Sequence, residues 1–172
     1  MKYRTIDLFC GAGGFSKGFE LTKKFHILKG YDNNDVALKT FSKNHQGEGI
    51  NYDIREAVPN ELKNNVDVVI GSPPCQGFSD AKGSRSLEDE RNDLVFHFIR
   101  WVNEIKPKVF VMENVAGLLT IDDNFVKEVE RRYDESGYYI DYNIYNSKDF
   151  GVPQKRKRAI FVGINKEFFG NN

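Results

Sequence analysis

The sequence predicts an α/β fold: a doubly wound, mostly parallel, Rossmann-like sheet with helices on both faces. Apolar runs rich in β-branched and aromatic residues alternate with amphipathic, helix-like stretches. Gly, Asn or Pro residues bound these runs, and a glycine-rich turn follows the first of them. The 172 residues suffice for one domain with its own core, so a single domain is expected.

The expected strands are short apolar segments at residues 3–9, 26–31, 66–71, 108–113, 138–145 and 159–164. A weaker strand is expected to end at Asp53. Helices are expected between them at residues 15–24, 34–44, 91–105 and 122–136, with Gly137 as the stop signal of the last. Residues 80–90 are polar and aperiodic, which predicts a long surface loop.

Composition excludes several classes of protein. Hydrophobic residues make up 40% and charged residues 29% of the chain, which excludes a disordered chain. Lys and Arg together number 25, as do Asp and Glu, so contact with nucleic acid would need a local basic patch. No apolar run is long enough to span a membrane and no signal-peptide core is visible, so we expect a cytoplasmic protein. The two cysteines, Cys10 and Cys75, lack zinc-site spacing, so no metal is expected.

The glycine-rich turn reads Asp-Leu-Phe-Cys-Gly-Ala-Gly-Gly from residue 7 and opens the first helix. Small residues and unpaired helix N–H groups suit a nucleotide-like ligand, although a purely structural tight turn is the alternative. Ser16 stands where a dinucleotide fingerprint needs its third glycine, which disfavours NAD. Asp32 ends the second strand and either binds a ribose diol or caps the next helix. Together the two features favour an adenosine-type ligand.

Cys75 follows two prolines at the same predicted sheet edge. A lone cysteine is more often a buried small hydrophobe, but this loop setting favours a nucleophile whose direction the prolines fix. A free thiol is only about 3% ionised at pH 7, so a nucleophile needs an activating environment or an activated electrophile. No histidine is adjacent in sequence, which disfavours a Cys-His protease.

Two further polar features lie at the ends of expected strands. Glu113 lies at the carboxyl end of an apolar strand, where it is placed to donate a proton or, alternatively, to cap the next turn. Four cations in a row follow Gln154. Alternation along an extended segment predicts that Gln154, Arg156 and Arg158 share one face, while Lys155 and Lys157 share the other and meet solvent or phosphate.

The order Asp-Leu-Phe-x-Gly-x-Gly-Gly, Pro-Cys-Gln, Glu-Asn-Val and Gln-x-Arg-x-Arg resembles the catalytic half of the cytosine-C5 DNA methyltransferases, from about Thr5 to Ile164. The resemblance implies an antiparallel last strand and S-adenosylmethionine as cofactor. It implies these cofactor-binding residues: Phe9, Gly11, Ala12, Gly13, Gly14, Asp32, Asn33, Asp53, Ile54, Pro74 and Leu94.

The implied reaction acts on a cytosine flipped out of double-stranded DNA. Cys75 attacks C6, Glu113 binds N3 and the exocyclic amine, and Arg158 holds O2. Residues 80–90 match the family's closing loop, and Arg91 matches a motif that anchors its far end. The remaining candidate catalytic residues come from the same motifs: Asn114, Gln154 and Arg156.

Complete family members continue past the Gln-x-Arg-x-Arg strand with a target recognition region. We therefore expect a split enzyme in which a second polypeptide supplies that region, a view that zero net charge supports. The alternatives are a truncated or non-catalytic cofactor-binding subunit and a tRNA-directed cytosine-C5 methyltransferase. The DNA recognition sequence and any accompanying restriction enzyme are beyond what the sequence predicts.

Overall fold

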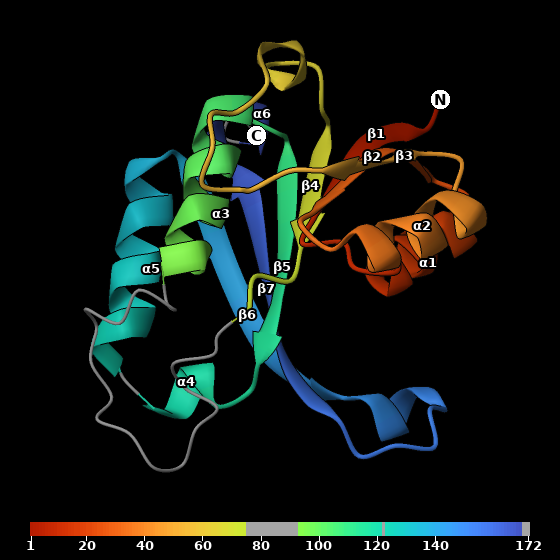
Figure 1. Cartoon of the computed structure of the whole chain (residues 1–172). Coiled ribbons are helices and arrows are strands. Elements are labelled where there is room, and N and C mark those ends of the chain that lie inside the picture. Colours follow the sequence, from red (N-terminus) through yellow and green to blue (C-terminus); the bar gives the residue numbers. More distant parts are fainter. Residues whose placement is uncertain (75–92, 122, 170–172) are drawn as a thin grey trace.

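The computed structural model describes residues 1–74, 93–121 and 123–169. Their core is a seven-stranded sheet in the order β3-β2-β1-β4-β5-β7-β6. Helices lie on both faces of the sheet, α1 and α2 on one side and α3 and α5 on the other (Figure 1). The structure thus confirms the predicted doubly wound α/β fold.

The strands of this sheet are four to nine residues long. They are β1 (Tyr3–Leu8), β2 (Phe25–Asp32), β3 (Glu48–Asn51), β4 (Val68–Gly71), β5 (Val109–Val115), β6 (Tyr138–Asn146) and β7 (Lys157–Asn165). Strands β1 to β5 pair in parallel, whereas β7 runs antiparallel to both β5 and β6. The expected antiparallel last strand is therefore confirmed, and it places Arg158 opposite Val115 at the carboxyl end of β5.

The helices connect the strands and cover them. They are α1 (Gly14–Leu21), α2 (Asp35–Asn44), α3 (Asp93–Ile105), α4 (Leu118–Ile121), α5 (Asp123–Glu135) and α6 (Lys166–Phe169), with short 3₁₀ turns at Asn60–Leu62 and Ser147–Phe150. The larger hydrophobic cluster lies where α3 and α5 pack on the sheet. A smaller cluster of Cys10, Ile27, Leu38 and Phe41 lies under α1 and α2.

Element boundaries differ from the sequence expectations at several places. The first helix ends at Leu21 rather than at residue 24, because Lys23 adopts a left-handed backbone with φ 62° that a helix cannot contain. Strand β3 ends at Asn51, so Asp53 lies in the following turn. Gly137 has φ 82° and ends α5 as expected.

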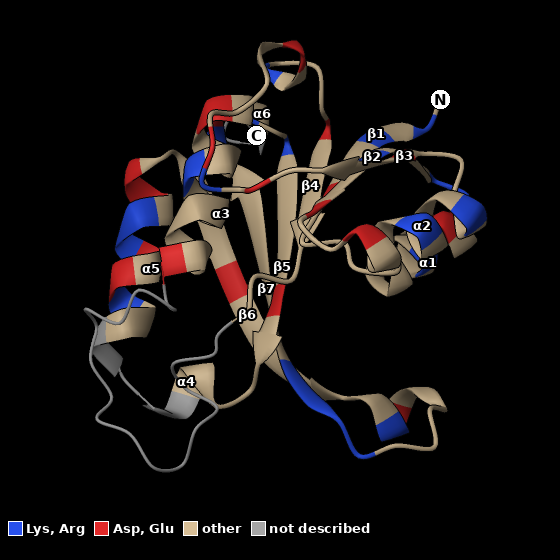
Figure 2. Cartoon of the chain, viewed as in Figure 1, with Lys and Arg blue, Asp and Glu red and all other residues tan. Residues whose placement is uncertain are grey.

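Charged side chains are spread over the surface, but the arm that leads into β7 carries a basic run (Figure 2). The predicted loop at residues 80–90 and Arg91 lie outside the described residues. Among the helices that the structure describes, none combines the length and the apolar character needed to cross a bilayer.

Candidate active site at the carboxyl edge of the sheet

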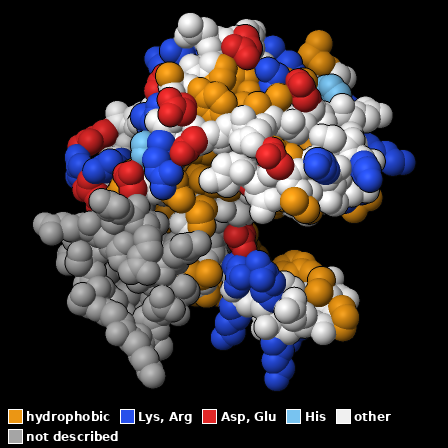
Figure 3. All heavy atoms as spheres, viewed as in Figure 1, with side chains coloured by type: hydrophobic (Ala, Val, Ile, Leu, Met, Phe, Trp, Pro, Cys, Tyr) orange, Lys and Arg blue, Asp and Glu red, His pale blue; other side chains and the backbone are white. Residues whose placement is uncertain are grey.

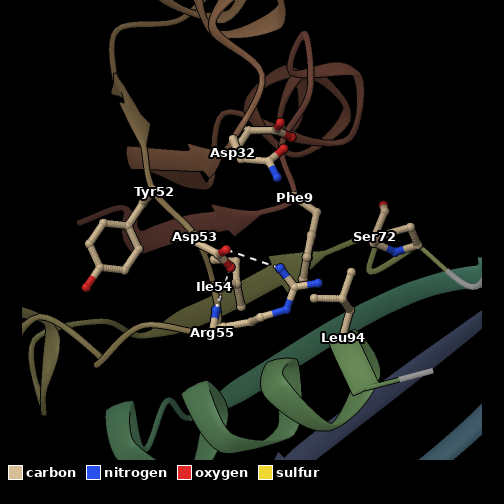
Figure 4. A pocket seen from close by; sticks show the side chains of 10 residues that line it. Phe9, Asp32, Tyr52, Asp53, Ile54, Arg55, Ser72 and Leu94 are labelled. Atoms are coloured by element: carbon tan, nitrogen blue, oxygen red, sulfur yellow. Dashed lines mark hydrogen bonds and ion pairs between the residues drawn. The ribbon is translucent and has the colours of Figure 1, made fainter. Parts of the chain in front are cut away.

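A cavity of about 280 Å³ opens at the carboxyl ends of β1, β2 and β4 (Figure 4). Seven predicted cofactor residues line it: Phe9, Asp32, Asn33, Asp53, Ile54, Pro74 and Leu94. The structure thus brings together residues that are up to 85 positions apart, counted from Phe9 to Leu94. We call it the first cavity.

The glycine-rich turn borders the first cavity. Phe9, Gly11 and Gly13 have positive φ values of 61°, 52° and 90°, and the N–H of Gly13 closes the turn on the Cys10 carbonyl at 2.8 Å. A Cβ atom on Gly13 would overlap the ring of His45, so glycine is required there for space as well as for conformation. Gly11, Ala12 and Gly13 form the turn itself, whereas Gly14 lines a second cavity.

Asp32 links this turn to the loop after β2. Its Oδ2 accepts the N–H of Gly11 at 2.8 Å, and its Oδ1 accepts the N–H of Asn34 at 2.9 Å. The alternative that Asp32 caps the next helix is wrong, because the N-cap of α2 is Asn34, whose Oδ1 accepts from the N–H groups of Val36 and Ala37. Each carboxylate oxygen of Asp32 keeps a further lone pair with which it can accept a hydrogen bond from a ligand hydroxyl.

A tight turn, Asp53 to Glu56, forms the wall opposite Asp32. The Glu56 N–H donates to the Asp53 carbonyl at 3.0 Å, and Asp53 Oδ1 accepts the N–H of Arg55 at 2.9 Å. The Arg55 guanidinium also reaches Asp53 Oδ2 at 3.1 Å. These contacts with the backbone N–H and then the guanidinium of Arg55 hold the pKa of the Asp53 carboxyl below its usual value, so it is a charged acceptor at neutral pH.

Sequence reasoning missed three residues that line the first cavity: Tyr52, Arg55 and Ser72. Tyr52 and Arg55 flank the predicted Asp53-Ile54 pair, which was the available signal. In Figure 4 the Arg55 guanidinium lies across the cavity from Asp53 toward Leu94. Ser72 follows β4 and precedes the two prolines.

The second cavity, of about 590 Å³, lies beside the first at the same edge. Its lining is Gly14, Phe15, Ser72, Glu113, Tyr145, Ser147, Phe150, Val152, Arg156, Arg158 and Ile160. Ser72 lines both cavities, so the two adjoin at this residue. Figure 3 shows the basic arm beside a deep recess in the surface.

Glu113 and Arg158 meet in the second cavity, as the sequence predicts. Glu113 Oε1 lies 2.6 Å from Arg158 Nε and 3.7 Å from Arg156 Nη2. Both partners of the closer pair are largely shielded, with side-chain exposures of 19% and 25%. The two arginines therefore share a face, as alternation predicts, whereas Gln154 is exposed before β7 and does not line the cavity.

Asn114 is buried in β5 and lines neither cavity. Its Nδ2 donates to the Pro73 carbonyl at 3.1 Å, and its Oδ1 accepts the N–H of Val115 at 2.8 Å. Asn114 therefore fixes the two-proline segment that leads to Cys75. Cys75 itself lies outside the described residues.

Two buried groups support the glycine-rich turn from below. The hydroxyl of Ser16 donates to Asp7 Oδ2 at 2.6 Å, and burial raises the pKa of the Asp7 carboxyl to about 7. Burial, with the nearby carboxylates of Asp7 and Asp32, also raises the pKa of the Cys10 thiol well above its usual value. Cys10 is thus a packing residue of the smaller core cluster and a poor nucleophile.

Within the described ranges, no group of three or more His, Cys, Asp or Glu side chains is placed to hold a metal ion. The described residues at this edge offer a carboxyl group paired with guanidinium groups, next to a cavity with acidic and apolar walls. Such an arrangement can bind a nucleoside on one side and polarise a planar heterocycle on the other.

Comparisons with known proteins agree with this geometry. The chain is 37% identical over 165 residues to the Type II methyltransferase M.FnuDI of Fusobacterium nucleatum, covering 95% of this chain and 47% of that protein. It is 40% identical over 173 residues to the Type II methyltransferase M.XorII of Xanthomonas oryzae pv. oryzae, covering 94% and 40%. The chain therefore spans about half the length, or less, of the curated relatives it matches.

Solved structures share the fold. A prophage-encoded Escherichia coli protein classed as a DNA modification methyltransferase superposes with a TM-score of 0.82 at 29% identity, covering 98% of this chain and 48% of that one. The Entamoeba histolytica methyltransferase EhMeth superposes with a TM-score of 0.79 at 25% identity, covering 95% and 53%. The sequence model of the C-5 cytosine-specific DNA methylases matches residues 3–171. The chain belongs to the C-5 cytosine-specific DNA methylase family.

Proposed function

We propose that this chain forms the catalytic and cofactor-binding part of a DNA (cytosine-5-)-methyltransferase that uses S-adenosylmethionine. One observation carries the proposal: two cavities adjoin at Ser72, one with the features of an adenosine site and the other holding the Glu113–Arg158 pair. Family membership supports the same reading, and the relatives named above are Type II methyltransferases.

The residues of the first cavity fit S-adenosylmethionine. The cofactor has a ribose diol and a flat aromatic adenine that carries an exocyclic amine. Asp32 offers free lone pairs to the diol, Asp53 is a charged acceptor for an N–H group, and Phe9, Ile54 and Leu94 supply apolar walls. When bound, the cofactor supplies an electrophilic methyl group on a sulfonium.

The residues of the second cavity fit the Watson–Crick edge of a cytosine. That edge presents an amine donor, the N3 acceptor and the O2 acceptor in a row. A carboxyl group beside a guanidinium, as in the Glu113–Arg158 pair, matches a donor next to an acceptor. Because this edge is paired inside a duplex, the cytosine has to flip out of the stack to reach the cavity.

In the proposed reaction, the electron pair of the Cys75 thiolate forms a bond to C6, and the π electrons of the C5–C6 double bond move to C5 and the conjugated ring. Glu113 holds a proton at N3, and Arg158 stabilises the negative charge at O2. With the cofactor bound, C5 would form the new carbon–carbon bond to the methyl group as the bond between that methyl carbon and the sulfonium sulfur breaks, and S-adenosylhomocysteine would leave as the neutral thioether. Loss of the C5 proton to a base and cleavage of the C6–sulfur bond restore the aromatic ring and the thiolate.

We propose DNA rather than tRNA as the substrate, on the strength of the family and of the relatives named above. The expectation that a second polypeptide supplies a target recognition region stays a prediction. So does the closing role of residues 80–90.

The test is transfer of a labelled methyl group from S-adenosylmethionine to mixed-sequence duplex DNA or to tRNA, with Cys75→Ser as the control. We expect the wild type to transfer label to DNA. The Cys75→Ser variant should transfer no label but should still bind S-adenosylhomocysteine. Label in tRNA alone, or undiminished transfer by the variant, would contradict the proposal.

Covalent trapping covers the case in which this chain alone does not turn over. DNA containing 5-fluorocytosine retains its C5 substituent, so the adduct with Cys75 cannot be resolved. Cofactor binding without any trapped adduct, even when the chain is supplemented with the regions that its relatives contain, would favour the non-catalytic alternative.

A further inference from the structure

We propose that Arg100 is a positioning residue for the adenosine end of the cofactor, acting through the Asp53 to Glu56 turn that forms one wall of the first cavity. The inference rests on the proposed function for the identity of the ligand. Arg100 does not line the cavity itself. It lies on α3, in the turn of helix that faces this wall from behind.

The contact is concentrated on one nitrogen. Arg100 Nη2 donates to three consecutive backbone carbonyls: Ile54 at 2.7 Å, Arg55 at 3.1 Å and Glu56 at 2.7 Å. Carbonyl oxygens that converge on one point repel one another, much like those at a helix C-terminus, and a cation at that point stabilises them. Arg100 therefore neutralises the carbonyl side of the turn while the Asp53 side chain faces the cavity.

Trp101 adds a second hydrogen-bond contact from α3 to this turn. Its Nε1 donates to the Ile54 carbonyl at 2.9 Å, and the indole ring is fully buried. The ring packs edge-on against Tyr31 and Tyr52, with centroids 5.2 Å and 5.8 Å apart. Because Tyr52 is itself part of the cavity wall, α3 holds this wall at two adjacent points.

The wall matters because four of the ten residues lining the cavity are consecutive: Tyr52, Asp53, Ile54 and Arg55. In a tight turn the directions of the carbonyls and of the side chains are coupled. If the carbonyls lose their donor and rotate toward water, the Asp53 carboxylate and the Ile54 side chain move with them. A ligand that contacts both would then bind more weakly even though no residue touching it has changed.

The competing interpretation is that Arg100 only stabilises the fold. Arg100 also pairs with Glu104 at 3.3 Å, a half-buried contact on the same helix that leaves the turn untouched. Glu104→Gln is therefore a matched control, because it removes the negative charge that pairs with Arg100 without removing the hydrogen bonds from Arg100 to the carbonyls. A purely structural role predicts that Arg100 substitutions lower the melting temperature and leave the affinity of the folded protein unchanged.

The experiment measures binding of S-adenosylhomocysteine and of 5′-methylthioadenosine by calorimetry to the whole chain, well below the melting temperature of each variant. Losing a charge-assisted bond to these carbonyls should weaken binding of both probes by the same factor, roughly tenfold for Arg100→Gln. Arg100→Lys keeps a cation and should recover part of the affinity, and Glu104→Gln should bind like the wild type.

Trp101 supplies a spectroscopic readout, because it is the only tryptophan of the chain. We expect S-adenosylhomocysteine to change its fluorescence in the wild type and to produce a smaller change in Arg100→Gln. If the wild type binds but the Arg100 variants bind equally well, the positioning role is overturned. If the wild type binds neither probe, the proposed function itself is overturned.

Discussion

The two cavities at the carboxyl edge hold their polar groups in different ways. In the first, backbone groups fix the acidic side chains, Asp32 by two N–H donors and Asp53 by the N–H of Arg55, and the Arg55 guanidinium adds an ion pair to Asp53. In the second, Glu113 and Arg158 are held mainly by each other, 2.6 Å apart. The first cavity is therefore preorganised for its ligand, whereas a ligand in the second cavity has to share or open the ion pair between Glu113 and Arg158.

The elements behind the cavities account for this contrast. The first cavity is formed by parallel strands and by loops that run directly into helices, so backbone N–H groups are available at every strand end. The second is completed by the antiparallel pair β5 and β7, whose backbone groups already bond across the strands. Side chains must therefore supply its polarity, and cofactor binding should be separable from base chemistry.

The first prediction, which carries the greatest change in activity, tests whether cofactor binding can be separated from base chemistry. Glu113→Gln keeps the shape of the side chain but removes its charge and its ability to hold a transferable proton. We expect methyl transfer to fall by roughly 100- to 10,000-fold, with S-adenosylhomocysteine affinity unchanged because Glu113 lines only the second of the two cavities.

Glu128→Gln is the matched control for this change. Glu128 also pairs with arginines, Arg131 and Arg132, but on the outer surface of α5. Transfer by this variant should equal that of the wild type. Loss of S-adenosylhomocysteine affinity in Glu113→Gln, measured by calorimetry, would show that the two cavities form one coupled site. That result would contradict the separation of cofactor binding from base chemistry.

A second prediction concerns the rigidity of the glycine-rich turn. Gly13→Ala adds a methyl group that overlaps the rings of His45 and Phe41 at a position with φ 90°. We expect it to lower the free energy of unfolding by about 2–4 kcal/mol and to weaken S-adenosylhomocysteine binding.

Gly14→Ala is the neighbouring control, since its added methyl group meets nothing within 4 Å and its φ is not positive. Its free energy of unfolding should stay within about 1 kcal/mol of the wild type. Urea denaturation of both variants checks the pair. Equal stability of the two would mean that the turn relaxes freely, and the first cavity would then be less preorganised than its geometry indicates.

The smallest expected effect concerns the buried carboxyl beneath the turn. Asp7 has a pKa of about 7 in the folded chain against an ordinary value of 3.8, so the folded protein holds a proton that the unfolded chain releases. The resulting stabilisation is present at low pH and is lost as the pH rises through about 7. Between about pH 5.5 and 7.5 the loss should be about 2 kcal/mol.

Asp7→Asn is neutral at every pH and should remove that dependence. The measurement is the free energy of unfolding of wild type and variant across this pH range, with the difference between the two curves as the quantity of interest. Parallel curves would show that Asp7 does not titrate there. A difference that grows with pH in favour of the variant is the expected result.

Much of the site could be predicted because its residues follow a positional rule. The carboxyl ends of parallel strands meet at one edge, so an acid or a glycine turn after a strand reads as a site residue without any knowledge of long-range packing. This rule found Asp32 and Glu113, whereas Phe9 and Asp53 came from the family resemblance. The antiparallel β7 came from family resemblance, and it placed Arg158 beside Glu113.

The residues that were not predicted act through long-range or local backbone geometry. Arg100 and Trp101 read as ordinary members of an amphipathic helix, and only the folded chain brings them to carbonyls more than 40 positions away. The choice of Asn34 over Asp32 as the cap of α2 depends on where the helix begins, which propensity leaves uncertain by a residue or two. The early end of α1 depends on the left-handed Lys23.

The burial of Cys10 has a practical consequence. The chain has two cysteines, and the one in the smaller core cluster is shielded and has a raised thiol pKa. A maleimide or iodoacetamide dye that modifies the native protein at neutral pH should therefore attach to Cys75. A fluorophore attached in this way marks Cys75 without any engineered substitution. Slower labelling in the presence of an oligonucleotide would then report that the oligonucleotide covers Cys75.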